Sequence, residues 1–265
     1  MSAKIPIESN ANCKDSFQAI SLALRLSRSI AATAHTAVPP LRRYKADWPI
    51  CYDSAIALKL AVCQQRSPST IAQQITAACA IEGNWQTHIT SSGLIRFQCS
   101  EPEIADYLQQ LLSVQDDRTM LELHPDCSIP ADSLFRVQYV HARCCLLLRS
   151  AVREGWLPSS PLPVLPWLTD TGELRLQHRF ERQTIGFLLD AVDAIATLQT
   201  GDRLWKQAVG LSRSLDAFQA ACRIWGEVKA SDMVLAQARL GLTWAGQMLL
   251  RALLDRLGLD APTLL

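Results

Sequence analysis

The chain has 265 residues, of which 49% are hydrophobic and 19% charged, so it can bury a large core and is neither disordered nor collagen-like. Its 26 basic and 25 acidic residues give a formal net charge of +1, so any nucleic-acid binding must depend on a local basic patch. No apolar run approaches the roughly 20 residues that a membrane-spanning helix needs, which excludes a transmembrane protein.

Residues 1–112 have the pattern of a small α+β domain. Apolar residues recur at helical spacing in several segments, and two β-rich segments flank Ser91-Ser92-Gly93, a sequence typical of a hairpin turn. Asp53 stands where an aspartate can cap a helix, and Pro68 where a first-turn proline is tolerated. In chain order we expect a helix over 16–32, helices opening after Asp53 and at Pro68, strands over 85–90 and 94–99, and a helix from Glu101.

After a predicted linker at residues 113–131, the pattern is helical throughout. Four prolines between Pro158 and Pro166 exclude a helix or a central strand there, which predicts an extended connector. The helix from Met233 to Leu257 is apolar almost all round and is expected to form the buried centre of a bundle. The other helices are predicted from Asp132 to about Gly155, from Leu176 to Leu198 with Thr200-Gly201 as the cap, and from Leu204 to Trp225. The predicted fold class is mainly α: a small α+β domain followed by an all-α bundle over 132–265.

Three segments of this second domain resemble motifs of one known family. Residues 137–143 read VQYVHAR, residues 218–226 read FQAACRIWG, and residues 257–262 read LGLDAP. They are similar, in order and spacing, to the VQYAHAR, FYxxCRVLG and LLGIxAP motifs of the arginyl-tRNA synthetases, which belong to the anticodon-binding domain called DALR. The resemblance implies a DALR helical bundle that binds tRNA. The chain departs from the family at Thr263-Leu264-Leu265, because the family commonly ends in Pro-x-x-Met, whose end helps shape the anticodon pocket.

The first domain is similar to the additional N-terminal domain of the same synthetases. Residues 55–61, 67–72 and 92–97 correspond to its ALxLAK, NPxxIA and GFINF segments, which implies contact with tRNA near the D-loop. However, the HIGH-type and KMSKS-type strings that a class I synthetase needs to stabilise the transferring phosphate are absent. A linker of roughly twenty residues cannot hold an α/β domain, which needs about a hundred or more. We therefore expect a synthetase-like chain without the catalytic domain, unable to activate an amino acid.

The helix that begins at Asp132 carries the strongest candidate binding face. Tyr139, Arg149 and Arg153 lie, with Leu146, on the side opposite the core-facing residues. Aromatic rings stack on bases and arginine binds phosphate with two parallel hydrogen bonds, so this mixture suits RNA. The alternative interpretation is a solvated helix face without a ligand.

Two further positions are candidates for binding. Arg179 and Arg182 form a second basic cluster with Arg175, which either binds RNA or is an ordinary surface of mixed charge. Trp244 lies on the polar stripe of the last helix, where a tryptophan can stack on a base, contact a protein partner or pack beneath a loop.

The remaining reactive side chains predict no catalytic residue, metal or cofactor. His141 has no second ligand at a metal-binding spacing, and Cys144 and Cys145 point about 100° apart on a helix. The carboxylates Asp190 and Asp193 are interpreted as part of a solvated face. Nine cysteines without regular spacing and a start without a secretory signal predict a reduced chain in the cytoplasm.

These observations leave two functional hypotheses. The first is a non-catalytic tRNA-binding protein that acts as a chaperone, with arginine tRNA as one candidate, or as an adaptor for a modifying enzyme. The second is a protein-interaction scaffold or assembly factor that kept the synthetase fold and lost RNA binding, which the near-neutral charge favours. Salt-dependent binding to tRNA would distinguish the two hypotheses.

Overall fold

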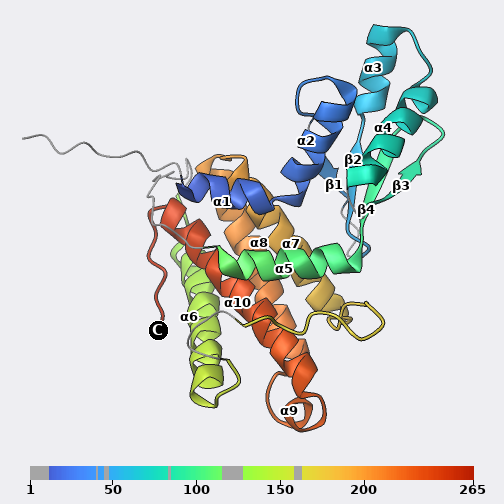
Figure 1. The fold of residues 1–265 in the computed structure, drawn as a ribbon. Coiled ribbons are helices and arrows are strands. Elements are labelled where there is room, and N and C mark those ends of the chain that lie inside the picture. The colour runs from blue at the N-terminus through green and yellow to red at the C-terminus, as the bar shows by residue number, and fades with distance from the viewer. Residues whose placement is uncertain (1–11, 40, 45–47, 83–84, 115–127, 158–162) are drawn as a thin grey trace, which may run out of the picture.

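The computed structural model describes residues 12–39, 41–44, 48–82, 85–114, 128–157 and 163–265, which form ten helices and one four-stranded antiparallel sheet (Figure 1). The mainly α fold class is confirmed. Within these ranges no helix has both the length and the apolar character needed to cross a membrane. In chain order the elements are α1 (Asn12–Ile20), α2 (Leu22–Ala34), β1 (Arg42–Arg43), β2 (Cys51–Ser54), α3 (Ile56–Gln64), α4 (Pro68–Glu82), β3 (Trp85–Ile89), β4 (Ile95–Cys99), α5 (Glu101–Ser113), α6 (Ala131–Arg153), α7 (Arg179–Ala196), α8 (Gly201–Ala221), α9 (Glu227–Ser231) and α10 (Met233–Arg256).

The first unit is built around the sheet, whose strand order is β1-β2-β4-β3. The predicted hairpin of β3 and β4 is confirmed, and Gly93 in its turn has a φ of +88°, a conformation that residues with a side chain rarely adopt. Along β4, Ile95, Phe97 and Cys99 are buried and the residues between them are half-buried, as expected for a strand with one covered face. α4 packs against β3, α2 and α3.

Two predictions about this unit are wrong. The single helix expected over 16–32 is two helices, because Ser21 separates them and caps α2, its Oγ accepting a hydrogen bond from the Leu24 N–H at 3.1 Å. Asp53 does not cap a helix. It lies in β2 opposite Arg96 of β4, and the two side chains form a bidentate ion pair with distances of 2.8 and 3.0 Å.

α10 lies at the centre of the bundle, as predicted, and contacts α5, α6, α7, α8 and α9. Its side chains Leu249, Leu250 and Leu253 are fully buried. Gly246 allows a close approach of α8, because a Cβ at this position would lie 2.5 Å from Leu215 Cδ2. Since α8 and α10 each contact both α6 and α7, the helices α6 and α7 occupy opposite corners of the bundle.

The predicted boundaries between α7 and α8 are wrong. α7 ends at Ala196, and Gly201 is the first residue of α8 rather than the C-terminal cap of the helix before it. Glycine is tolerated at either end of a helix, so the sequence pattern does not decide between the two. α8 ends at Ala221, which leaves Trp225 outside the helix predicted to contain it.

The first unit packs directly against the bundle. α1 and α2 contact α7, and α5 crosses α10, so the hydrophobic core is continuous (Figure 1). The buried Tyr107 hydroxyl donates a hydrogen bond to the Leu188 carbonyl at 3.3 Å. Residues 115–127 of the predicted linker and 158–162 of the predicted connector lie outside the described residues. The domain boundary at residue 112 stays a prediction.

Candidate nucleic-acid interface

The outer face of α6 carries exposed aromatic and apolar side chains beside arginines. Phe135 and Tyr139 are 56% and 48% exposed, and their rings stack with centroids 6.3 Å apart and planes inclined by 26°. Farther along the helix Leu146 is 54% exposed, and Arg149 and Arg153 are exposed as well. The structure therefore places Tyr139, Arg149 and Arg153 on one outward face, as the helical period predicted, and Phe135 extends that face.

A groove of about 390 Å³ lies beside the two rings, between α6 and α8. Its lining includes Phe135, Arg136 and Tyr139 from α6 and Val209, Arg213 and Asp216 from α8. Sequence reasoning missed Phe135, Arg136 and Arg213. Phe135 stands one helical turn before Tyr139, so its spacing is a signal that could have identified it, whereas nothing in the sequence indicates which helix lies beside α6.

The charges around this groove are only partly compensated. Arg143 forms an ion pair with Asp216 at 3.1 Å, and since both side chains are partly exposed, the pair contributes little to stability. Arg136 and Arg213 have no ion-pair partner among the described residues. Their guanidinium groups are therefore available to an anion at the groove.

The segment after α10 runs along one side of α6. The Gln138 side chain donates to the Asp260 carbonyl at 2.9 Å, and Arg149 Nη2 donates to the Thr263 carbonyl at 3.0 Å. Leu264 and Leu265 remain exposed. The departure from the family pattern thus places two exposed leucines beside the outer face of α6, and Arg149 uses one donor within the chain.

His141 is a structural residue of the core. A carbonyl can only accept, so His141 Nδ1 carries the proton and donates to the Pro262 carbonyl at 2.9 Å. Nε2 is then free to accept from the Gln247 side-chain amide at 2.8 Å. Burial lowers the pKa of His141, which favours this neutral form. The histidine therefore fixes the segment after α10 to α6 and is not a catalytic base.

The second basic cluster lies away from the outer face of α6, because it belongs to α7 at the opposite corner of the bundle. Arg182 stacks on the Trp48 ring at 4.8 Å and donates to the Gln177 side chain, so it contacts the first unit. Arg179 is exposed and stacks on the Phe180 ring at 4.5 Å. The structure does not join Arg179 and Arg182 to Tyr139 in one patch.

Trp244 is half-buried and packs against the core. Gln247 belongs to the same predicted polar stripe of α10 as Trp244. Its side chain makes a hydrogen bond with His141 inside the protein and does not face solvent alone. A role for Trp244 in contacting RNA or a protein partner stays a prediction.

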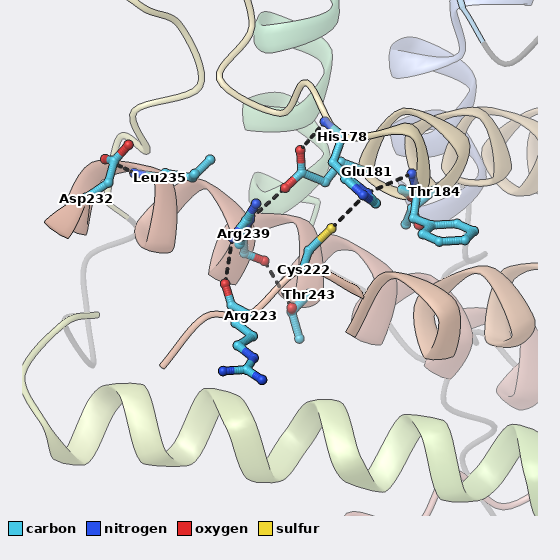
Figure 2. A network of polar contacts seen from close by, with 10 residues as sticks. His178, Glu181, Thr184, Cys222, Arg223, Asp232, Leu235, Arg239 and Thr243 are labelled. Atoms are coloured by element: carbon cyan, nitrogen blue, oxygen red, sulfur yellow. Dashed lines mark hydrogen bonds and ion pairs between the residues drawn. The ribbon is translucent and has the colours of Figure 1, made fainter. Parts of the chain in front are cut away.

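A network of polar contacts fastens the N-terminus of α7 to α10 (Figure 2). Glu181 is 1% exposed and accepts hydrogen bonds from the His178 N–H at 2.8 Å and from Arg239 Nε at 2.6 Å. Arg239 also donates to the Arg223 carbonyl at 2.7 Å. The contact between the Cys222 thiol and His178 Nδ1, at 3.2 Å, has the geometry of a nucleophile and a base. Burial, however, raises the pKa of Cys222 to about 12, so this thiol is not an activated nucleophile.

The described residues contain no group of three or more His, Cys, Asp or Glu arranged to hold a metal ion. The seven cysteines whose side chains the structure describes are free, and six of them are buried.

Comparison with known proteins finds relatives for the second half of the chain. Residues 137–265 match the family described as the DALR anticodon binding domain. An arginine–tRNA ligase of Shouchella clausii is 27% identical over 161 residues, which cover 59% of this chain and 27% of the ligase. Those of Oleidesulfovibrio alaskensis and a Synechococcus species are 33% identical over 134 residues and 35% identical over 130 residues, covering 49% and 48% of this chain.

These matches span only 22% and 21% of the latter two ligases, so the chain covers about a fifth to a quarter of the length of these relatives. No solved structure matches the chain. The family match begins at residue 137, so the similarity of residues 1–112 to the additional N-terminal domain stays a prediction. Residues 137–265 are therefore similar to the DALR anticodon-binding domain and to the matching part of the arginine–tRNA ligases.

Proposed function

We propose that this chain is a non-catalytic tRNA-binding protein and that it binds RNA at the groove between α6 and α8 and on the adjacent outer face of α6. The observation that carries the proposal is the exposed, stacked pair Phe135 and Tyr139, which lines the groove together with Arg136 and Arg213. Unpaired bases stack on aromatic rings and phosphates bind arginine, so the surface suits a single-stranded RNA loop. The DALR domain supports tRNA as that RNA.

The proposed role is that of a chaperone for tRNA, or of an adaptor that presents tRNA to a modifying enzyme in the cytoplasm. Arginine tRNA is the first candidate, because the relatives are arginine–tRNA ligases. Arg149 and Arg153 would contact phosphates of the RNA backbone next to the groove.

The aromatic pair provides the direct test. Phe135→Ala and Tyr139→Ala are each expected to weaken tRNA binding by about 5- to 150-fold, the range for losing one stacked base. Fluorescence anisotropy with labelled arginine tRNA measures the Kd, and circular dichroism verifies the fold. Leu198→Ala, at an apolar position of comparable exposure (52%) just after α7, is the matched control and should bind as the unaltered protein does. Unchanged affinity in both aromatic variants would contradict the proposal.

The proposal also predicts no aminoacylation. With arginine, ATP and tRNA, the purified chain is expected to catalyse neither pyrophosphate exchange nor charging of tRNA, because the sequence lacks the motifs that stabilise the transferring phosphate. Exchange that persists through repurification, and that copurifies with this chain rather than with a contaminating ligase, would show that the protein is an enzyme.

A second candidate function has its own supporting observation. Leu146, Leu264 and Leu265 are all more than half exposed, and Arg149, one turn after Leu146, donates a hydrogen bond to the carbonyl of Thr263, the residue before the other two. Exposed apolar patches are common in protein–protein interfaces. In this alternative the chain is an interaction scaffold that no longer binds RNA, and Trp244 is a contact residue. Absence of salt-dependent tRNA binding, together with an RNase-resistant protein partner recovered from cells, would favour it.

A further inference from the structure

The first unit docks on α7 through a stripe of polar contacts. The Arg43 guanidinium of β1 binds Asp190 with two bonds of 2.6 Å. Gly186, one turn earlier in α7, makes room for it, because a Cβ there would lie 3.2 Å from Arg43 Nη1. This ion pair fixes the sheet to the bundle and satisfies the charges of both side chains.

Asp193, one turn beyond Asp190, is the second carboxylate of the stripe. Its two oxygens accept hydrogen bonds from Ser21 Oγ at 2.7 Å and from the Tyr52 hydroxyl at 3.5 Å, both in the first unit. Ser21 and Tyr52 are at most 1% exposed. Among the described residues Asp193 has no ion pair of its own, so its half-buried carboxylate faces two neutral donors at the joint.

All the titratable groups around this carboxylate come from elements packed at the joint. Asp190 on α7 disfavours its negative charge, and Arg43 on β1 favours it. Tyr52 on β2 donates a hydrogen bond to it. The negative charge of Asp193 also acts on the buried Tyr107 of α5 and helps to raise the pKa of that hydroxyl. Burial is the largest influence and raises the pKa of Asp193 to about 6.

We propose that this joint is a proton-controlled latch, in which a proton on Asp193 tightens the docking of the first unit on α7 and its release loosens the docking. A protonated carboxyl keeps the hydrogen bond from Ser21 and carries no unpaired charge into the joint. The Arg43–Asp190 pair contributes to docking whether Asp193 is protonated or ionised. The latch does not involve RNA, so its test is independent of the test of the proposed function.

The sign of the effect follows from linkage. When the units separate, Asp193 becomes solvated and returns to an ordinary pKa near 3.8, whereas in the docked state its pKa is about 6. Between pH 3.8 and about pH 6 the docked state therefore binds more protons than the separated state. Docking accordingly weakens as the pH rises through this range. Each unit of pKa difference is a factor of ten in the equilibrium, so docking should be about tenfold stronger at pH 5 than at pH 7.5.

Hydrogen exchange of the full chain tests the latch. After correction for intrinsic rates, peptides from α1, α2 and α7 are expected to be about tenfold better protected at pH 5 than at pH 7.5. In Asp193→Asn this difference should vanish, because the amide accepts from Ser21 but cannot ionise. Asp106→Asn, at an exposed carboxylate on α5, is the matched control and should keep the full difference.

Tyr52→Phe provides an independent readout should the asparagine variant be unstable. It keeps the ring and removes one donor to the ionised carboxylate, so the pH midpoint of protection should move upward. A pH dependence retained in Asp193→Asn, or an unmoved midpoint in Tyr52→Phe, would overturn the proposal. So would a protection change of the same size in α3, which would indicate opening of the whole chain rather than of the joint.

Discussion

Glu181→Ala is expected to lower the free energy of unfolding by about 3–5 kcal/mol, the cost of leaving one partner of a buried ion pair uncompensated. Arg239 is only 12% exposed in its side chain, so without Glu181 its charge would remain in the protein interior. The variant also removes the acceptor for the His178 N–H at the start of α7. Urea denaturation followed by circular dichroism measures the change.

Two variants control for this prediction. Glu154→Ala removes the partner of Lys229 in an ion pair that is more than one-third exposed on both sides, and stability should hardly change. Glu181→Gln keeps an acceptor for the His178 N–H and should fall between the unaltered protein and Glu181→Ala. If Glu181→Ala is as stable as Glu154→Ala, the network of Figure 2 does not hold α7 and α10 together.

The double charge reversal Arg149→Glu with Arg153→Glu is expected to abolish most tRNA binding while the fold is kept. Both side chains are exposed on the outer face of α6, so the change adds repulsion and removes phosphate partners without disturbing the core. The slope of log affinity against log salt should fall by roughly 0.7 to 0.9 for each phosphate contact that is lost. Titrations of labelled tRNA between low and physiological salt give both quantities.

The matched control changes the net charge equally at a distant place. Arg28→Glu with Arg66→Glu alters exposed residues of α2 and of the turn after α3, far from α6 (Figure 1) and outside the segments that are similar to the tRNA-contacting N-terminal domain. If this control loses as much affinity as the α6 variant, net charge rather than the α6 face governs binding. If neither variant loses affinity, tRNA binds away from the α6 face and the proposed site is wrong.

Elements with a strong period could be predicted from the sequence, and contacts between distant segments could not. The regular apolar positions of α6 and the all-round apolar surface of α10 identified both helices and the outward face with Tyr139. The sequence predicts a solvated face for Asp193, because nothing in it places a pocket between this carboxylate and Asp190. Its partners Ser21 and Tyr52 lie more than 140 residues earlier in the chain, and only the docked fold brings them to α7.

Only part of the candidate site could be predicted from the sequence. The helical period of α6 aligns Tyr139, Arg149 and Arg153, whereas the groove depends on the pairing of α6 with α8, which supplies Arg213. A single sequence specifies which face of a helix is apolar, but not which neighbour covers it. For this reason the sequence leaves Arg182 either on an RNA surface or on a surface of mixed charge, whereas in the structure its guanidinium stacks on Trp48 of the first unit.

The central position of α10 has a consequence for how the chain is made. All five of its partners, α5 to α9, are synthesised before it, and the four longer ones, α5 to α8, pack apolar residues against it. During translation these apolar residues have no partner until α10 has left the ribosome, so the bundle should form late and in one cooperative step. In that interval the nascent helices are exposed to aggregation, and chaperones that bind apolar segments would be most useful to this protein just before α10 emerges.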